Sequence, residues 1–407
     1  MQKLPLTGIR VADFCQVRAG AHATQWLAIM GAEVIKIETQ LRPDLTRIAY
    51  VPGRPDLSQG LNQGNGFADL NYGKKSISLN MNKPEARELA RKLIKFCDIV
   101  ADNFGGPVME RWGLGYEGLK KIKPDIIALS VCGWGRTGPY TERPAFAPII
   151  DAFNGFLYTN GYIDGEPAVV GSGGWTDSIA AQHGTFAVLS ALYHRDKTGE
   201  GQYIDLSMTE AGLVTAPELV MNYTMNKNII GRTGNRDEIM APHGCYRCQG
   251  EDQWVAIAVA GDEEWCALCD VMGNPEWTNR EEFSDALSRW QNRDELDRLI
   301  TEWTRHYTHY EVMTMLQAAG VMAGASLDIE EMALDPQLKE RGFMVEMEHP
   351  VMGKIVRTGL PWKLSDTPRG NFLPPPLLGE HNNDVFGKLL GLTKAEIERL
   401  VKEQVLC

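Results

Sequence analysis

The stretch from Ile9 to Glu38 decides the fold: it reads IRVADFC at 9–15, AGAHATQWLAIMG at 19–31 and EVIKIE at 33–38. The first and third pieces are short apolar runs typical of buried strands, and the second has apolar residues at helical spacing. Two similar strand runs, DIVADNF at 98–104 and DIIALSVC at 125–132, follow the helical stretch EARELARKLIKFC at 85–97. Strands joined by helical crossovers predict an α/β fold with a parallel sheet.

Composition narrows the class of protein. The chain has 407 residues, of which 43% are hydrophobic and 23% charged, as in ordinary globular proteins. Its 41 basic and 53 acidic residues give a net charge of −12, which argues against a general nucleic-acid binder. No apolar run approaches the roughly 20 residues that span a bilayer, and the N-terminus lacks the apolar run of a signal peptide. We therefore expect no membrane association and a cytoplasmic location.

The pattern changes in the second half of the chain. Short strand-like runs with Gly turns occupy about 241–254, and helical, Trp-rich segments follow at 263–319. These features predict a second, smaller domain at 222–330. The tail beyond it contains the run LPPPLL at 373–378 and a capped helix opening at Thr393. It is too short to fold alone, so we expect it to dock on the larger domain.

Two familiar alternatives fit poorly. After the first strand the chain has a single glycine, Gly20, where a dinucleotide-binding turn needs three, so a nicotinamide enzyme is disfavoured. The pairs Cys245/Cys248 and Cys266/Cys269 have a spacing compatible with a zinc site. Their strand-like and helical surroundings favour free thiols packed in the core over a metal site.

A Gly-rich turn precedes a candidate nucleophile. The sequence VGSGGWTD at 170–177 ends in Asp177 and leads into a long helical stretch. Position alone favours a helix N-cap for Asp177. The alternative is a carboxylate nucleophile with backbone amides nearby to hold an oxyanion.

Basic residues gather near the expected carboxyl ends of strands, where α/β sheets bind ligands. Arg18, Arg111, Lys74 and Lys75 are candidates to line one anion pocket in an otherwise acidic protein. For any single lysine, a solvated surface position is the competing interpretation.

Taken in order, six segments resemble the class III CoA-transferases, the family of formyl-CoA:oxalate and carnitine CoA-transferases. They are LTGIRVADF (6–14), GAEVIKIE (31–38), KKSISLNMN (74–82), ADNFGGPVMERWGLGYE (101–117), WTDSIAAQHGTFAVLSALYHRDKTGEGQYIDLSM (175–208) and LLGEHNNDVFGKLLGL (377–392). The resemblance implies a large Rossmann-like domain built from 1–221 and 331–407, a small domain at 222–330, and an interlocked dimer with its active sites between the domains.

The resemblance also implies site residues. The catalytic aspartate falls on Asp177, and no metal is expected. Coenzyme A (CoA) contacts fall on Arg18, Ala19, Thr39, Leu79, Asn80, Met81, Asn82, Asn103, Phe104, Gly105 and Arg111. Several family members have Arg where Thr39 stands, so one phosphate contact differs. The family's active-site glycine loop is not recognisable, and His243, in the segment MAPHG at 240–244, is either an acceptor contact or a turn histidine.

The implied reaction transfers CoA from an acyl-CoA to a carboxylic acid through an aspartyl anhydride and an aspartyl-CoA thioester. Phe146 and Trp175 suggest an acceptor with aromatic bulk, and the chain is similar to the branch that transfers CoA from succinyl-CoA to benzylsuccinate. Carnitine and other small acids stay open. A racemase is disfavoured because Phe146 stands where that branch has its histidine. The partner is either a second copy or a homologous subunit, and a catalytically silent structural subunit is the remaining alternative.

Overall fold

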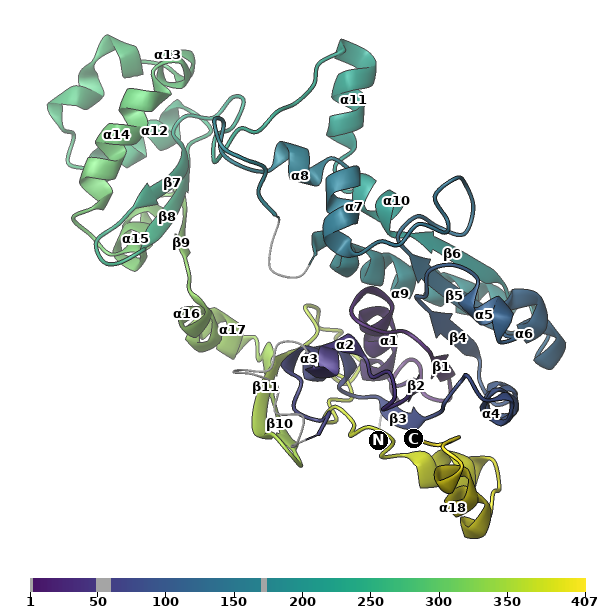
Figure 1. Cartoon of the computed structure of the whole chain (residues 1–407). Coiled ribbons are helices and arrows are strands. Elements are labelled where there is room, and N and C mark those ends of the chain that lie inside the picture. The colour runs from purple at the N-terminus through teal and green to yellow at the C-terminus, as the bar shows by residue number, and fades with distance from the viewer. Residues whose placement is uncertain (1–2, 49–59, 170–173) are drawn as a thin grey trace. The chain divides into compact units, whose positions relative to one another are not determined.

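The computed structural model describes residues 3–48, 60–169 and 174–407. These divide into two compact units (Figure 1). The first comprises residues 1–157, 169–229 and 340–407, and the second comprises 158–168 and 230–339. The sequence predicts domain boundaries at 222 and 331, and these stay a prediction. The two compact units have their boundaries at 230 and 340 instead, and residues 158–168 belong to the second unit.

A six-stranded parallel sheet forms the centre of the first unit, in the order β3-β2-β1-β4-β5-β6. The strands are β1 (Arg10–Asp13), β2 (Glu33–Glu38), β3 (Lys75–Ser78), β4 (Ile99–Asp102), β5 (Ile127–Cys132) and β6 (Tyr203–Ser207). The predicted α/β fold with a parallel sheet is therefore confirmed. Strand order reverses between β1 and β4, the point at which open sheets of this kind bind ligands.

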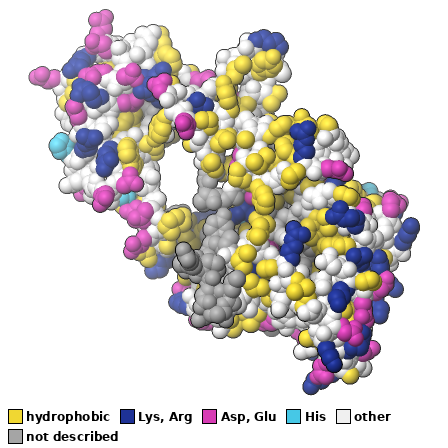
Figure 2. Space-filling model, in the orientation of Figure 1, with side chains coloured by type: hydrophobic (Ala, Val, Ile, Leu, Met, Phe, Trp, Pro, Cys, Tyr) yellow, Lys and Arg dark blue, Asp and Glu magenta, His cyan; other side chains and the backbone are white. Residues whose placement is uncertain are grey.

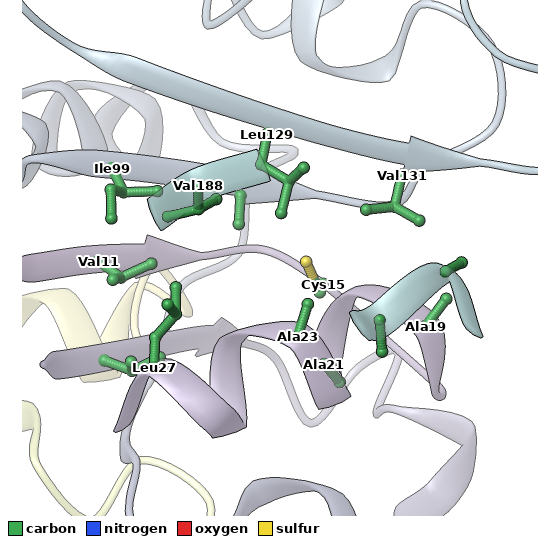
Figure 3. Close-up of a cluster of buried hydrophobic side chains, with 14 of the residues drawn as sticks. Val11, Cys15, Ala19, Ala21, Ala23, Leu27, Ile99, Leu129, Val131 and Val188 are labelled. Atoms are coloured by element: carbon green, nitrogen blue, oxygen red, sulfur yellow. The ribbon is translucent and has the colours of Figure 1, made fainter. Parts of the chain in front are cut away.

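Helices cover both faces of the sheet. Helix α1 (Ala19–Ile29) and the 24-residue α9 (Trp175–Thr198) pack on one face. On the other lie α4 (Pro84–Ile94), α6 (Tyr116–Ile122), the π-helix η4 (Asn383–Leu389) and α18 (Lys394–Lys402). Figure 3 shows the first face, where Val11, Ile99 and Leu129 from the strands meet Leu27 of α1 and Val188 of α9.

The remaining elements of this unit flank the sheet or follow it. They are α2 (Leu45–Ile48), α3 (Asn65–Asn71), α5 (Val108–Arg111), α7 (Ala147–Phe153), α10 (Met208–Leu213), α11 (Pro217–Asn226) and the hairpin β10 (Met344–His349) with β11 (Gly353–Thr358).

The C-terminal tail packs against the edge of the same sheet. Its helix α18 opens with the predicted capping box, in which Thr393 Oγ1 accepts from the Glu396 amide and the Glu396 carboxylate accepts from the Thr393 amide. Beyond the helix, the carbonyl of Val405 accepts from the Asn80 amide and that of Cys407 accepts from the Gln40 amide. Residues next to the carboxyl ends of β2 and β3 are thereby tied to the last turn of the chain.

The second unit has its own core. An antiparallel sheet of β7 (His243–Arg247), β8 (Trp254–Ala258) and β9 (Met322–Ser326) packs against α12 (Asp262–Val271), α14 (Arg293–Thr304) and α15 (His309–Ala318). Shorter elements are η2 (Glu276–Asn279), η3 (Glu281–Phe283), α13 (Ala286–Gln291) and α16 (Ile329–Leu334). Helices α8 (Phe156–Thr159) and α17 (Pro336–Glu340) lie where one unit gives way to the other. Within the described ranges, no helix has the length and apolar character needed to cross a membrane.

Candidate active site

Buried charged side chains hold the loop between β1 and α1. Lys36 and Asp44 form an ion pair at 3.0 Å with no exposed side-chain surface. The Lys36 ammonium also donates to the Cys15 carbonyl at 2.6 Å, and the Asp44 carboxylate accepts from the Val17 amide at 3.1 Å. Val17 has φ +60°, a left-handed conformation that β-branched residues rarely adopt. The ion pair therefore fixes the path of the chain into α1.

A neighbouring amide side chain completes this loop. Asn103, directly after β4, accepts from the Gln16 amide at 2.8 Å and donates to the Gln16 carbonyl at 2.7 Å. It was expected to contact CoA; in the structure both ends of its side-chain amide are used by the backbone of the loop.

The loop after β4 is held in a similar way. Arg136 donates to the Asp102 carboxylate at 2.8 Å and to the Gly106 carbonyl at 2.6 Å. Burial raises the pKa of Asp102 to about 6, although the Arg136 charge lowers it. Both loops at the strand-order reversal are thus supported by ionic groups beneath them.

The two lysines expected in an anion pocket lie elsewhere. Lys74 is fully buried and donates to the Asp13 carboxylate at 2.9 Å and to the Ala21 carbonyl at 2.7 Å. Burial alone would raise the pKa of Asp13, but the charges of Lys74 and Lys36 outweigh it and hold that pKa below its usual value. Lys75 pairs with Glu33 at 2.6 Å on the surface. The prediction that these lysines line a ligand pocket is wrong, because each already neutralises a carboxylate.

Asp177 lies in the first turn of α9. The N-cap of this helix is Gly174, so Asp177 is its third residue and the N-cap interpretation from the sequence is wrong. Gly174 has φ +81°, and a Cβ added there would lie 2.2 Å from the Ala147 Cβ and 3.0 Å from Asp177 Oδ2. Only glycine fits at this close approach. Most of the Gly-rich turn before it, residues 170–173, falls outside the described residues.

The Asp177 carboxylate is partly buried and accepts a hydrogen bond from the Ala19 amide at the start of α1. Burial raises its pKa to about 7; the Arg18 charge and the Ala19 hydrogen bond oppose this, and the Asp151 charge adds to it. The first amides of a helix also have no intrahelical acceptor and favour negative charge. The result is a carboxylate of raised basicity beside backbone donors, which suits a nucleophile.

A cavity of about 440 Å³ opens at the carboxyl ends of β1 to β4. Its lining includes eight of the predicted CoA contacts: Thr39, Leu79, Asn80, Met81, Asn82, Phe104, Gly105 and Arg111. The remaining predicted contacts, Arg18, Ala19 and Asn103, lie in or beside the loop from β1 to α1. Gln16, in that loop, lines the cavity, and Ala19 three residues later hydrogen bonds to Asp177. One loop therefore connects the cavity to the candidate nucleophile.

Three arginines give the cavity a positive lining. Arg42 and Arg111 are exposed and have no hydrogen-bonding or ionic side-chain partner within the described ranges. Arg87 donates to the Met81 carbonyl at 2.8 Å. The one acidic lining residue, Glu38, is paired with the buried Arg47 at 2.7 Å. Guanidinium groups in this arrangement are suited to phosphate groups.

Aromatic side chains form one wall of the same cavity. The Trp112 ring lies 5.4 Å from the Phe104 ring in an edge-to-face contact and 6.2 Å from that of Phe14. An apolar wall next to unpaired arginines can accommodate a ligand with both an aromatic base and phosphates. Four of these lining residues were not predicted from the sequence as site residues: Arg42, Arg87, Phe14 and Trp112. The position of Arg42, a few residues beyond β2 in an acidic chain, was the available signal.

The expected acceptor contacts lie in different units. Phe146 is the N-cap residue of α7 and Trp175 opens α9, and both are more than half exposed. His243 belongs to the second unit, where it lines a separate cavity of about 530 Å³ and donates from Nδ1 to the Asn235 carbonyl at 2.8 Å. The same cavity contains an ion pair between Arg236 and Asp297 at 3.4 Å.

The cysteines occur as free thiols. Cys266 and Cys269 lie in α12, as the sequence indicated, and Cys245 lies in β7. Across residues 3–48, 60–169 and 174–407, no group of three or more His, Cys, Asp or Glu side chains is arranged to hold a metal ion.

Comparison with known proteins agrees with this arrangement. Residues 6–382 match the model of CoA-transferase family III. The chain belongs to this family of enzymes, which transfer CoA between carboxylic acids.

Individual family members match along nearly the whole chain. The chain is 32% identical to a succinyl-CoA–L-malate CoA-transferase beta subunit from Chloroflexus aurantiacus, with 99% of this chain and 98% of that one covered. It is 30% identical to a formyl-CoA:oxalate CoA-transferase from Rhodopseudomonas palustris, covering 97% and 96%. A crystal structure of a CAIB/BAIF family protein from Brucella suis superposes with a TM-score of 0.87 at 30% identity, covering 95% of this chain and all of that one.

The buried pair beneath the site gives a first prediction. Replacing Lys74 with Met should lower the free energy of unfolding by about 3–5 kcal/mol, because Asp13 would be left charged and unpaired in the core. The matched change Lys75→Met breaks a surface pair and should cost about 1 kcal/mol or less. Urea denaturation of the two variants would measure both values. Equal losses would contradict the assignment of Lys74 to the core.

Proposed function

We propose that this chain is a catalytic CoA-transferase subunit in which Asp177 is the nucleophile. The observation that carries the proposal is the contact between the Asp177 carboxylate, in the first turn of α9, and the Ala19 amide, which donates a hydrogen bond to it. Ala19 follows the loop from β1 to α1, and Gln16 of that loop also lines the arginine-rich cavity. A silent structural subunit would not need a basic, partly buried carboxylate at this position, so this alternative is disfavoured.

CoA is the substrate that the cavity at β1 to β4 suits. Arg42, Arg87 and Arg111 would bind its phosphates, and the wall of Phe104 and Trp112 would face its adenine. Arg42 supplies a cation three residues after Thr39, where several family members have their arginine. The pantetheine thiol would then extend along the loop from Gln16 toward Ala19 and Asp177.

The proposed reaction keeps an activated acyl bond throughout. An Asp177 oxygen attacks the donor thioester carbonyl, the carbon–sulfur bond breaks and CoA leaves as a thiolate, giving a mixed anhydride. The thiolate attacks the Asp177 carbonyl and displaces the donor as a free carboxylate, which leaves an aspartyl-CoA thioester. The acceptor carboxylate attacks this thioester and releases the thiolate again. The thiolate then attacks the acceptor carbonyl of the second anhydride and restores the Asp177 carboxylate.

Each tetrahedral oxyanion in this sequence needs hydrogen-bond donors, and each anhydride needs protection from water. The Ala19 amide, which already acts on the Asp177 carboxylate, and the first amides of α9, which have no intrahelical acceptor, are the candidate donors.

We propose succinyl-CoA as the donor and benzylsuccinate as the acceptor. Trp175 is the first residue of α9, and Phe146 is the N-cap residue of α7. The ring of Trp134 packs edge-to-face on that of Phe153 in α7, with 4.8 Å between the ring centroids. Trp175, two residues before Asp177, and the aromatic residues on and around α7 favour an acceptor with an aromatic ring. L-Malate is the second candidate acceptor, because it appears with succinyl-CoA in the name of the relative from Chloroflexus aurantiacus.

We also propose that the chain assembles into an interlocked dimer with itself or with a homologous subunit. Exposed apolar side chains gather over α7 and α11 (Figure 2), including Ile149, Phe153, Met221, Tyr223 and Met225, and no residue of α11 is buried. An apolar surface of this kind marks an interaction site. The designation of one relative as a beta subunit supports a heteromer.

Loss of the nucleophile gives the second prediction. Asp177→Ala should reduce CoA transfer by about four orders of magnitude or more while leaving the dissociation constant for CoA unchanged, because the carboxylate is needed for covalent chemistry only. The measurements are transfer rate by chromatography and CoA binding by calorimetry. Asp196→Asn, an exposed change on the same helix, is the control. Hydroxylamine should trap the acyl-enzyme as a hydroxamate on the peptide that contains Asp177. Substantial turnover by Asp177→Ala would disprove the assignment.

The arginine cavity gives the third prediction. Arg42→Ala and Arg111→Ala should each weaken CoA binding by roughly tenfold to a hundredfold, because each removes a charged hydrogen bond to phosphate. Binding of dephospho-CoA and CoA should be compared at low and high salt, with the exposed Arg305→Ala of the second unit as control. Unchanged affinity in both cavity variants would place CoA elsewhere.

Acceptor identity gives the fourth prediction. With succinyl-CoA as donor, benzylsuccinate should give the highest kcat/KM in a panel that also holds L-malate, oxalate and carnitine. Trp175→Ala should lower kcat/KM for benzylsuccinate more than for L-malate, because only the former has a ring to pack. The panel should be run on the chain alone and on any complex that it forms in its native source. No activity with benzylsuccinate in either sample would remove it as the acceptor.

A further inference from the structure

A second carboxylate, which the proposed reaction does not use, is buried behind Asp177. Asp151 of α7 is only 1% exposed. One of its oxygens accepts a hydrogen bond from the hydroxyl of Thr176, the residue before Asp177, and Thr176 has no exposed surface. The other oxygen, Oδ2, is buried and has no hydrogen-bond partner among the described residues. A buried carboxylate oxygen without a partner is costly, so its retention calls for a role.

The surroundings of Asp151 fix the first turn of α9 against α7. Gly174 approaches Ala147 so closely that a Cβ would not fit between them. Asn154, the C-cap residue of α7, lies 3.4 Å from the Thr176 hydroxyl and packs against Gly212 of α10. The turn that carries Asp177 is thus attached to α7 by a backbone contact and by the Thr176 hydroxyl.

Asp177 has one cationic and one anionic side chain acting on it. Arg18, before the first turn of α1, lowers the pKa of Asp177, and Asp151 from α7 raises it. Within the described ranges no Lys, Arg or His side chain forms an ion pair with Asp151, and its Oδ2 has no hydrogen-bond donor. The charges of Arg18 and Asp151 therefore act on the pKa of the candidate nucleophile in opposite directions.

We propose that Asp151 is a positioning residue, which holds Asp177 in place through the Thr176 hydroxyl and keeps an unneutralised negative charge behind that carboxylate. This inference rests on the proposed function of Asp177. The charge has a chemical consequence, because Asp177 is anionic in the free enzyme and neutral in both the anhydride and the aspartyl-CoA thioester. Repulsion from Asp151 exists only in the free carboxylate, so it favours acylation and makes the carboxylate more reactive.

The test separates the charge of Asp151 from its hydrogen bond. Asp151→Asn keeps an oxygen to accept from Thr176 and removes the charge. It should move the acid limb of the kcat/KM profile, near pH 7 in the unmodified enzyme, by about one unit toward lower pH. It should also lower kcat roughly threefold to tenfold at a pH above both limbs, because a less basic carboxylate is a weaker nucleophile. CoA affinity should not change.

Asp196→Asn is the matched control, because it removes one negative charge from an exposed position on α9 itself and should leave the profile unchanged. Thr176→Val removes the hydroxyl and keeps the charge. It should lower kcat, and Thr176→Ser should restore it. If Asp151→Asn has the same acid limb and the same kcat as the unmodified enzyme, the role of the charge is overturned. If Thr176→Val keeps full kcat, the positioning role is overturned. The Thr176→Val result stands even where Asp151→Asn does not fold.

A readout independent of turnover distinguishes this inference from the proposed function. The ionisation of Asp177 can be followed by infrared difference spectroscopy of the carboxyl stretch, with Asp177→Asn as the reference. A lower Asp177 pKa in Asp151→Asn supports the inference even in a protein without transferase activity. An unchanged Asp177 pKa overturns it even in a protein whose transferase activity requires Asp177.

Discussion

The ion pair between Lys36 and Asp44 determines how the chain passes from β1 into α1, and the rest of the site depends on that path. Neither side chain is exposed, and together they bind the Cys15 carbonyl and the Val17 amide. Buried backbone N–H and C=O groups in a loop need hydrogen-bond partners, and the neighbouring strands cannot provide them once the sheet has ended. Here buried charges supply them. Since a buried charge that loses its partner costs several kcal/mol, the loop has little freedom to move.

The same solution recurs at β4, where Arg136, paired with Asp102, donates to the Gly106 carbonyl. The strand-order reversal between β1 and β4 opens a crevice in any sheet of this topology, but it does not determine the shape of the loops around it. In this protein two sets of internal charges do so. These charges pair with one another inside the protein, whereas Arg42 and Arg111 have no side-chain partner among the residues that the structure describes. Burial therefore separates the cations that support the loops from those proposed to bind the ligand.

Which polar and charged residues are buried could not be predicted from the sequence. The runs at 9–15, 33–38, 98–104 and 125–132 identified four of the six strands, whereas β3 and β6 alternate polar with apolar residues, so no apolar run marked them. Lys74 looked like a pocket residue because a sequence does not show that Asp13 faces it. The family resemblance located the cavity through residues such as Asn80 and Phe104, but Arg42 lies outside the matching segments and emerged only from the three-dimensional arrangement.

The electrostatics of Asp177 follow from two requirements that conflict. A nucleophilic carboxylate must be ionised at neutral pH, which calls for cations and amide donors close by, yet strong neutralisation would lower its basicity and its reactivity. Among the described residues, the Ala19 amide and the Arg18 charge lower the pKa of Asp177, whereas its burial and the Asp151 charge raise it. The pKa of about 7 reflects mainly the burial of Asp177, which these opposing interactions adjust. A site proposed to bind phosphate needs no such balance, so its arginines can line a cavity of their own, while the loop from β1 to α1 brings the Ala19 amide to Asp177.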